Sequence, residues 1–308
     1  MEYTHYAAID IGSNAVRLLI KRLDDARTGR FSKDVMMRLP LRLGQDVFTR
    51  GEVGPKKLRN LVDLMRAYAI VMDIYSVSKA NRRICATCAL REANNSQVIV
   101  DSIRKAAGFD VEIISGQEEA NIVCSLNSPD DRRKLIYVDV GGGSTEVSLM
   151  CGGRVFGRKS YSIGTVKIIN GVEPEEWKRR LTDDLRKMAT DFAMQNMSDG
   201  KLTNAVIVGA GGNINKLFAI AQERDAFGQT MRTETLRTLY DELARMTVEQ
   251  RMVKYKLKAD RADVIVPAAE IFLTIADALG VPDIEIPSDG LADGIIVDIW
   301  KKQNKAKG

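Results

Sequence analysis

The chain has 308 residues, enough for two ordinary domains that each bury a core. With 45% hydrophobic and 28% charged residues, its composition is typical of a soluble globular protein and excludes a disordered one. The net charge of +5 is small and the basic residues alternate with acidic ones, so the charge favours anionic partners only weakly and indicates no nucleic-acid surface.

Strands and helices alternate in the first part of the chain. Strands are predicted over residues 6–11 and 16–23, with a tight turn at 12–14 between them. A helix is predicted to begin at Pro55, because proline suits the first turn of a helix. The elements expected after it are a strand at 84–87, a helix at 89–107, a strand at 111–114 and a helix at 117–126. This alternation predicts an α/β domain.

The same pattern then begins again. The predicted strands are 135–140, 146–150, 155–163, 205–208 and 284–286, and the predicted helices are 174–197, one after Gly212, 233–256, 262–279 and 291–304. We therefore expect two α/β domains, at residues 1–125 and 126–294. A C-terminal helix at about 295–308 is expected to pack back on the first domain.

Two turns in these domains resemble each other. Asp10–Asn14 and Asp139–Ser144 both follow an apolar strand and lead into another, and their aspartates lie 129 positions apart (139 minus 10). A chance pair of hairpins is the alternative. A duplicated domain explains the match better, and two similar halves meeting at a cleft would aim both turns at one ligand.

The turns indicate phosphate chemistry. Glycine lets several N–H groups point inward, and with a hydroxyl such as that of Ser13 or Ser144 such a set binds phosphate oxygens. An acid beside phosphate requires a cation such as Mg²⁺, for which the candidate ligands are Asp139, Glu146 and then Asp10. A hairpin with glycine at positive φ would explain one such turn without any ligand.

A third glycine cluster, Gly209–Gly212, lies at a strand-to-helix junction, where helix N-terminal amides bind anions. The candidate substrate-binding residues there are Gly211, Gly212 and Asn213. Neither the dinucleotide-binding nor the P-loop motif occurs at the first strand–helix junction.

Two further side chains are ambiguous. Ser115 and Glu118 have the spacing of a capping box, so Glu119 is not needed for the cap. Glu119 is either a surface acid that stabilises the helix dipole or a base that accepts a proton from water attacking phosphate. Arg91 is either a surface residue or a forked phosphate ligand.

The remaining composition excludes other chemistry. His5 is the only histidine, so a Ser-His-Asp triad or a histidine-rich metal centre is not expected. The four cysteines, Cys85, Cys88, Cys124 and Cys151, include one C-x-x-C spacing without a second, which favours buried thiols over zinc binding. The N-terminus lacks a signal-peptide pattern, and Glu270 and Asp277 interrupt the most apolar segment, so we expect a cytoplasmic protein without a membrane partner.

Seven motifs together resemble the exopolyphosphatase/guanosine pentaphosphate phosphatase family, in its short two-domain form. The motifs are Asp10–Asn14 (DIGSN), Ala86–Arg91 (ATCALR), Ile114–Ala120 (ISGQEEA), Asp139–Glu146 (DVGGGSTE), Gly209–Gly212 (GAGG), Arg261–Pro267 (RADVIVP) and Ser288–Gly290 (SDG). The resemblance implies two ribonuclease H-like domains of the actin, hexokinase and heat-shock ATPase superfold, with a cleft between them.

The resemblance also implies roles for single residues. Glu119 is similar to the carboxylate that activates the attacking water, and Asp139 and Glu146 match positions associated with the metal. The positions similar to phosphate-binding groups are Ser13, Asn14, Arg91, Gly141, Gly142, Gly143 and Ser144. Two positions depart from the family: Asn213 stands where threonine is usual, and Ala292 stands where arginine is usual.

The expected activity is hydrolysis of the terminal phosphate of inorganic polyphosphate, with Mg²⁺ or another divalent cation. Guanosine pentaphosphate is the alternative substrate. An ATP-dependent sugar kinase or a nucleotide-binding filament protein of the same superfold is the more distant alternative. A homodimer is left open.

Overall fold

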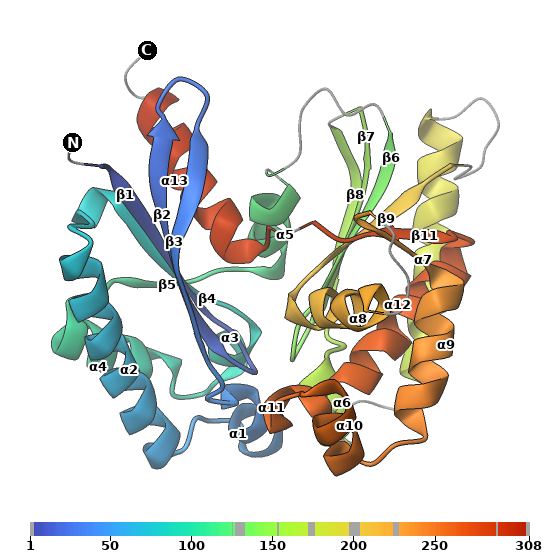
Figure 1. Cartoon of the computed structure of the whole chain (residues 1–308), viewed down its shortest axis with the longest axis horizontal. Helices are drawn as coiled ribbons and strands as arrows, with labels where there is room; N and C mark the ends of the chain where they lie inside the picture. The colour runs from blue at the N-terminus through green and yellow to red at the C-terminus, as the bar shows by residue number, and fades with distance from the viewer. Residues whose placement is uncertain are drawn as a thin grey trace. The chain divides into compact units, whose positions relative to one another are not determined.

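The computed structural model describes residues 3–124, 126, 133–152, 154–171, 176–196, 204–223, 228–287 and 289–305, without the side chains of 124, 192–196 and 305. The chain divides into two compact units (Figure 1). Unit 1 is Met1–Leu126 with Asp289–Gly308, and unit 2 is Asn127–Ser288. Each unit has its own sheet and its own cluster of buried apolar side chains.

Unit 1 contains a five-stranded sheet in the order β3-β2-β1-β4-β5. Its strands are β1 (His5–Ile11), β2 (Val16–Asp25), β3 (Arg30–Leu39), β4 (Arg82–Ala86) and β5 (Val111–Ile113). Short turns join β1, β2 and β3, which are therefore antiparallel, whereas β4 and β5 follow helices and run parallel to β1.

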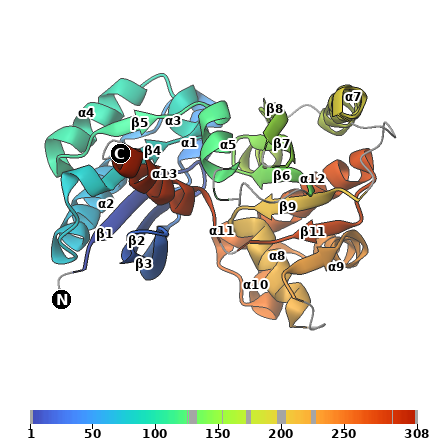
Figure 2. The same ribbon diagram turned by 90° about the horizontal axis from the view of Figure 1, so that it is seen from above.

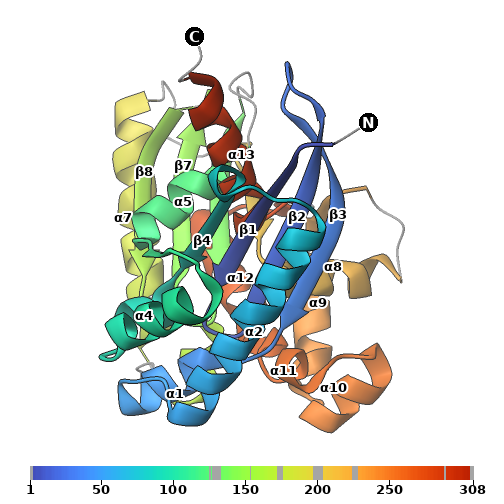
Figure 3. The same ribbon diagram turned by 90° about the vertical axis from the view of Figure 1, so that its left-hand side faces the viewer.

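Helices cover both faces of this sheet. They are α1 (Leu43–Arg50), α2 (Pro55–Ile74), α3 (Cys88–Glu92), α4 (Ser96–Ala107), α5 (Gly116–Cys124) and α13 (Leu291–Lys305), with a 3₁₀ turn at Lys79–Asn81. Figure 3 shows α2 and α4 on one face and α13 on the other. Alternate residues of β1 serve the two faces: Ile9 lies in the core with α2, whereas the Tyr6 hydroxyl donates to Gln303 of α13 at 2.9 Å.

Unit 2 contains a six-stranded sheet in the order β10-β11-β9-β6-β7-β8, much of which can be followed in Figure 2. The strands are β6 (Lys134–Val140), β7 (Thr145–Cys151), β8 (Arg154–Tyr161), β9 (Val206–Ala210), β10 (Thr230–Arg232) and β11 (Asp283–Glu285). Strands β6, β7 and β8 are antiparallel, and β9 and β11 run parallel to β6.

The helices of unit 2 are α6 (Thr165–Ile169), α7 (Trp177–Asn196), α8 (Gly212–Gln222), α9 (Thr233–Ala244), α10 (Val248–Tyr255), α11 (Ala259–Ala262) and α12 (Ile265–Leu279). Helix α12 is apolar on most of its surface and packs against α7, α8 and α9. This packing explains why the most apolar segment of the sequence lies inside the unit. None of the described helices is long and apolar enough to cross a membrane.

The prediction of one helix over 89–107 was wrong, because the chain leaves the helix between α3 and α4. The Asn95 side chain accepts a hydrogen bond from the Val53 N–H at 3.1 Å and donates one to the Val53 carbonyl at 2.9 Å. The Asn94 N–H donates to the Gly51 carbonyl at 2.8 Å. These bonds hold the segment against a distant loop in a conformation that a continuous helix cannot adopt.

The prediction of one helix over 233–256 was also wrong. Thr247 caps α10: its side chain accepts from the Gln250 N–H, and the Gln250 side chain accepts from the Thr247 N–H. This capping box begins a new helix. The predicted helix start at Pro174 and the side chain of Cys124 lie outside the described residues. The thiols of Cys85 and Cys88 are buried as expected, whereas Cys151 is half-buried.

Candidate active site

The two similar turns close in the same way. The Gly12 N–H donates to the Ala15 carbonyl at 3.1 Å, and the Gly141 N–H donates to the Ser144 carbonyl at 2.9 Å. Each turn joins the first two antiparallel strands of its unit, β1 to β2 and β6 to β7. The sequence repeat is therefore also a repeat of backbone structure.

The two hairpins differ in the residue that lies opposite the aspartate on the neighbouring strand. Asp10 pairs in register with Arg17, and the Arg17 Nη1 atom lies 2.5 Å from the Asp10 carboxylate. Asp139 pairs in register with Glu146. Unit 1 thus neutralises its aspartate with a cation on the next strand, whereas unit 2 places a second acid there.

The acid pair of unit 2 lies in a closely built environment. Glu146 is only 4% exposed, and its carboxylate accepts a hydrogen bond from the Ser160 hydroxyl at 2.8 Å. A Cβ atom on Gly211, whose φ is +105°, would lie 2.9 Å from the Asp139 Oδ1 atom. Only glycine therefore lets the backbone after β9 approach the Asp139 carboxylate so closely.

Two carboxylates side by side could hold a hard divalent cation, which takes one or two carboxylates and completes its shell with water and phosphate oxygens. Within the described ranges, no group of three His, Cys, Asp or Glu side chains is arranged to hold a metal ion. Among the sequence candidates, only Asp139 and Glu146 face each other in this way, since the Asp10 carboxylate is already paired with Arg17.

Hydrogen bonds from helix α6 hold the glycine turn of unit 2, Gly141–Ser144, in one orientation. Helix α6 begins beside it, and its first N–H groups donate to the turn: Thr165 to the Gly141 carbonyl at 3.1 Å and Val166 to the Gly142 carbonyl at 2.8 Å. In a planar trans peptide the N–H points opposite to the carbonyl. The N–H groups of Gly142 and Gly143 therefore point away from α6, and they can receive an anion.

The third glycine cluster lies beside the first. Strand β9 is parallel to β6, so Gly211, Gly212 and Asn213 follow the strand end next to the Gly141–Ser144 turn. The Arg261 Nη1 atom donates to the Asn213 Oδ1 atom at 2.9 Å and lies against Gly212. Asn213, which departs from the usual threonine, thus has a defined partner. No role was predicted for Arg261 from the sequence, although its motif is part of the resemblance.

In unit 1 the candidate residues lie at one edge of the sheet. Parallel strands β1, β4 and β5 end together, and the chain segments after them are linked by backbone bonds, Thr87 N–H to the Ile11 carbonyl at 3.2 Å and Ile114 N–H to the Ala86 carbonyl at 3.0 Å. The candidates in these segments are Ser13, Asn14, Arg91 and Glu119. Ligands of α/β proteins bind outside the carboxyl ends of such strands.

Arg91 and Glu119 approach each other at this edge. The Arg91 Nη1 atom donates to the Ile114 carbonyl at 2.7 Å and lies 4.0 Å from the Glu119 Oε2 atom. Glu119 is only 8% exposed although it lies in the first turn of α5. It is therefore not the solvated surface acid that its sequence position allowed.

Arg17 is the other residue of these sites for which the sequence predicted no role. It lies seven positions after Asp10 (17 minus 10), as Glu146 lies seven after Asp139 (146 minus 139). The repeat could have identified it as the counterpart of Glu146, but only with the register of both hairpins assumed.

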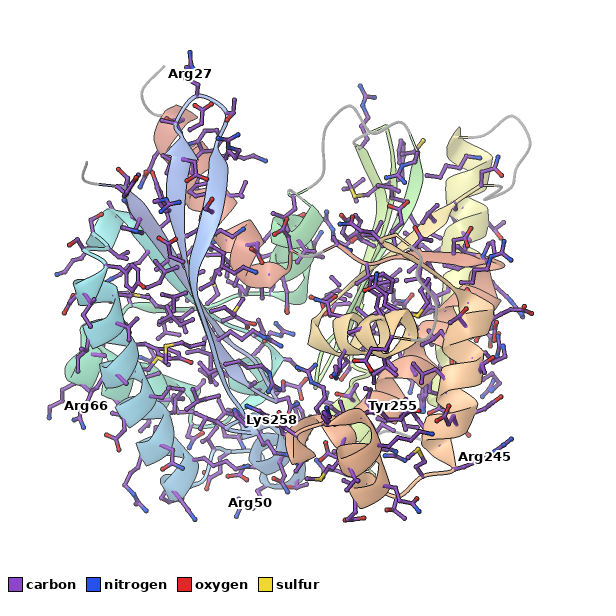
Figure 4. All side chains as sticks on the ribbon, in the orientation of Figure 1. Arg27, Arg50, Arg66, Arg245, Tyr255 and Lys258 are labelled. Atoms are coloured by element: carbon purple, nitrogen blue, oxygen red, sulfur yellow. The ribbon has the colours of Figure 1, made fainter. Side chains whose placement is uncertain are left out.

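A groove of about 1000 Å³ lies elsewhere, along α9 and α10 of unit 2. Arg245, labelled in Figure 4, is one of its lining residues. None of the residues that the sequence predicted for the active site lines this groove, so we do not assign it to the phosphate chemistry.

Comparison with known proteins agrees with these features. A Fusobacterium nucleatum protein named bifunctional 3-dehydroquinate synthase/phosphatase is 25% identical over 96% of this chain and 47% of its own length. A candidate exopolyphosphatase of Haemophilus influenzae is 25% identical over 96% of this chain and 91% of its own. The guanosine-5'-triphosphate,3'-diphosphate pyrophosphatase of Vibrio campbellii is 25% identical over 96% of this chain and 59% of its own length. The chain thus spans about half of the first of these relatives and three fifths of the third.

Solved structures show the same fold. The Ppx/GppA protein of Aquifex aeolicus matches with a TM-score of 0.76 at 24% identity, covering 98% of this chain and 99% of that one. An exopolyphosphatase from Cytophaga hutchinsonii matches with a TM-score of 0.82 at 19% identity, covering 97% and 98%. These matches confirm the predicted α/β fold with two actin-like units. Because residues 32–303 match the Ppx/GppA phosphatase family, the chain belongs to that family.

Proposed function

We propose that this phosphatase is an exopolyphosphatase, which removes the terminal phosphate of inorganic polyphosphate by attack of water. The observation that carries the proposal is the difference between the two hairpins. At matched positions, unit 1 pairs an acid with Arg17, whereas unit 2 pairs Asp139 with Glu146 beside outward-pointing amides. Acids and anion-binding amides at one strand end suit a substrate that brings phosphate together with a cation.

Asp139 and Glu146 are the residues that would hold the divalent cation, Mg²⁺ in the first instance. When bound, the cation would neutralise charge on the phosphate oxygens. The hydrogen bond from Ser160 to Glu146 and the contact of Gly211 with Asp139 would fix the directions of the two carboxylates. We leave Asp10 out of the cation site, because Arg17 already neutralises it.

The remaining candidates would bind phosphate groups or activate the attacking water. In unit 2, the N–H groups of Gly142 and Gly143 would bind phosphate oxygens. In unit 1, Arg91 would be a forked phosphate ligand. Glu119 would orient the attacking water and accept its proton. Its burial and its distance of 4.0 Å from Arg91 suit this role, because phosphate bound to Arg91 would lie near the carboxylate. The amides of Gly211, Gly212 and Asn213 are the candidates for a neighbouring phosphate.

Guanosine pentaphosphate is the second candidate substrate. It is favoured by the relatives named guanosine-5'-triphosphate,3'-diphosphate pyrophosphatase, which match 96% of this chain. The candidate exopolyphosphatase of Haemophilus influenzae matches this chain over 91% of its own length, against 59% for the Vibrio campbellii pyrophosphatase. We therefore place polyphosphate first.

The test is phosphate release from long-chain polyphosphate and from guanosine pentaphosphate at equal concentrations of phosphoryl ends. We expect faster release from polyphosphate, with Mg²⁺ required and excess EDTA abolishing release from either substrate. Faster release from the nucleotide would replace polyphosphate by guanosine pentaphosphate. Sugar-dependent ATP consumption without release from either substrate would indicate a kinase and contradict the hydrolase proposal.

A further inference from the structure

One partly buried arginine joins three parts of unit 1 around the start of α5. Arg83, on β4, has a side chain that is only 11% exposed. Its Nη2 atom lies 2.7 Å from carboxylate oxygens of both Glu112 on β5 and Glu118 on α5, and its Nη1 atom lies 3.1 Å from the Asp298 carboxylate on α13. A single guanidinium on β4 thus joins β5, α5 and α13.

The ion pair with Arg83 distinguishes Glu118 from the adjacent Glu119, because it gives Glu118 a structural role. Ser115 caps α5 by accepting the Glu118 N–H at 3.1 Å, which places Glu118 where a capping-box glutamate would reach back to the cap. The Glu118 carboxylate binds Arg83 instead. Successive residues of a helix point about 100° apart, so a Glu118 side chain fixed on Arg83 sets the direction of Glu119.

A second contact holds the same helix. A Cβ atom on Gly294 of α13 would lie 2.7 Å from the Ile122 carbonyl oxygen of α5, so the two helices approach at backbone distance. Helix α5 is therefore held at its first turn by Arg83 and one turn later by α13. Around Arg83, Asp298 also pairs with Lys302 at 2.8 Å.

We propose that Arg83, acting through Glu118, is a positioning residue for Glu119; this rests on the proposed role of Glu119 as the base. The Arg83–Glu118 contact fixes the rotation and tilt of the first turn of α5, and it keeps the Glu118 carboxylate away from the Arg91 guanidinium that Glu119 faces. Loss of this contact leaves substrate binding intact and displaces the base, so it lowers turnover.

Glu118 and Glu112 form a matched pair for the test. Both bind the same Nη2 atom at 2.7 Å, and their side chains are 44% and 52% exposed; Glu112 also accepts from the Arg83 Nε atom at 3.0 Å, but only Glu118 belongs to α5. The variants Glu118→Gln and Glu112→Gln each remove one charge from the same guanidinium. We expect Glu118→Gln to lower kcat about tenfold or more with KM little changed, because small displacements of a reacting group are costly. Glu112→Gln should keep kcat within about twofold, because Glu112 lies on β5 and its loss leaves the Arg83–Glu118 contact with α5 in place.

The variant Arg83→Lys supplies a second readout. Lysine keeps the charge but lacks the planar fork, so it cannot hold all three carboxylates. We expect it to lower kcat as Glu118→Gln does, with a normal KM. Equal kcat losses for the two glutamine variants would overturn the positioning role, as would a Glu118→Gln effect confined to KM or to the melting temperature. If Arg83→Lys does not fold, the glutamine pair alone decides. A wild-type protein without phosphatase activity would instead refute the proposed function.

Discussion

Glu119 combines two properties that surface helix residues do not share. It lies in the first turn of α5, where acids are common because they interact well with the helix N-terminus, yet it is buried. Its carboxylate faces the guanidinium of Arg91, whose Nη1 atom also binds the Ile114 carbonyl and is thereby fixed. A carboxylate and a guanidinium held at 4.0 Å leave room for a phosphate oxygen or water to contact both.

The variant Glu119→Gln should retain the fold and lose activity. Glutamine has nearly the same shape but cannot accept a proton from water, so phosphate release should fall about 10²–10⁴-fold. The measurement is kcat on polyphosphate at saturating Mg²⁺, with circular dichroism as the check on folding. Near-normal turnover would show that another group activates the water.

The variant Glu146→Gln tests the acid pair. If Asp139 and Glu146 hold the cation, loss of one carboxylate should raise the Mg²⁺ concentration for half-maximal activity about 10–100-fold, the range seen even for less direct losses at metal sites. The matched control is Glu285→Gln on β11 of the same sheet, which pairs with Arg133. An unchanged Mg²⁺ requirement for Glu146→Gln would remove Glu146 from the site.

At the scale of elements, the two helix breaks had different causes. The hydrogen bonds that fix the break between α3 and α4 join Asn95 to Val53, 42 positions away (95 minus 53), and no local pattern reveals that contact. The break between α9 and α10 depends on Thr247 and Gln250, a capping box that the sequence displays. It was missed because the apolar helical period continues across it.

The variant Thr247→Ala should destabilise unit 2 by about 0.5–2 kcal/mol, since it removes the hydroxyl that caps α10. Thr238 of α9 provides the control: its hydroxyl bonds to the Glu234 carbonyl within the helix, where alanine is a better helix former. Urea unfolding of the two variants measures the difference. Equal stabilities for both would show that the cap contributes nothing.

Much of the candidate site could be predicted because it depends on local pattern. The strands around Gly12 and Gly141 and the turns between them follow from apolar runs ending at glycine and serine. The proximity of Arg91 to Glu119 could not be read in this way, because it depends on β4 and β5 being parallel neighbours. The charge difference between the hairpins also required the register that pairs Asp10 with Arg17.

At the scale of the whole molecule, unit 1 is built from both ends of the chain. The Tyr6 hydroxyl bonds to Gln303, 297 positions away, and Lys21 on β2 forms an ion pair with Asp293 at 2.5 Å. Helix α13 therefore completes the core of a unit whose other elements lie before residue 127.

The variant Gly294→Ala should weaken the packing of α13 against the rest of unit 1. The added methyl group would collide with the backbone of Ile122, and overpacking of this kind costs about 1–3 kcal/mol. At Gly290, one turn earlier, nothing lies within 4 Å of an added Cβ atom, so Gly290→Ala is the matched control. Thermal unfolding should separate the two variants; a lower melting temperature for Gly290→Ala alone would contradict the closeness of α13 and α5.

The return of α13 has a consequence for synthesis of the protein. Domains generally fold as units while the chain leaves the ribosome. Residues 127–288 emerge as one continuous stretch and can fold as soon as they appear, whereas the sheet of residues 5–113 is completed by a helix that is translated after them. One of the two contacts that hold α5, the approach of Gly294 to Ile122, belongs to that helix, and Asp298 of the same helix binds the Arg83 side chain that makes the other. A nascent chain stalled before α13 would therefore carry Glu119 on a helix held by the Arg83–Glu118 contact alone, and we expect the proposed activity to rise only after the ribosome has passed that point.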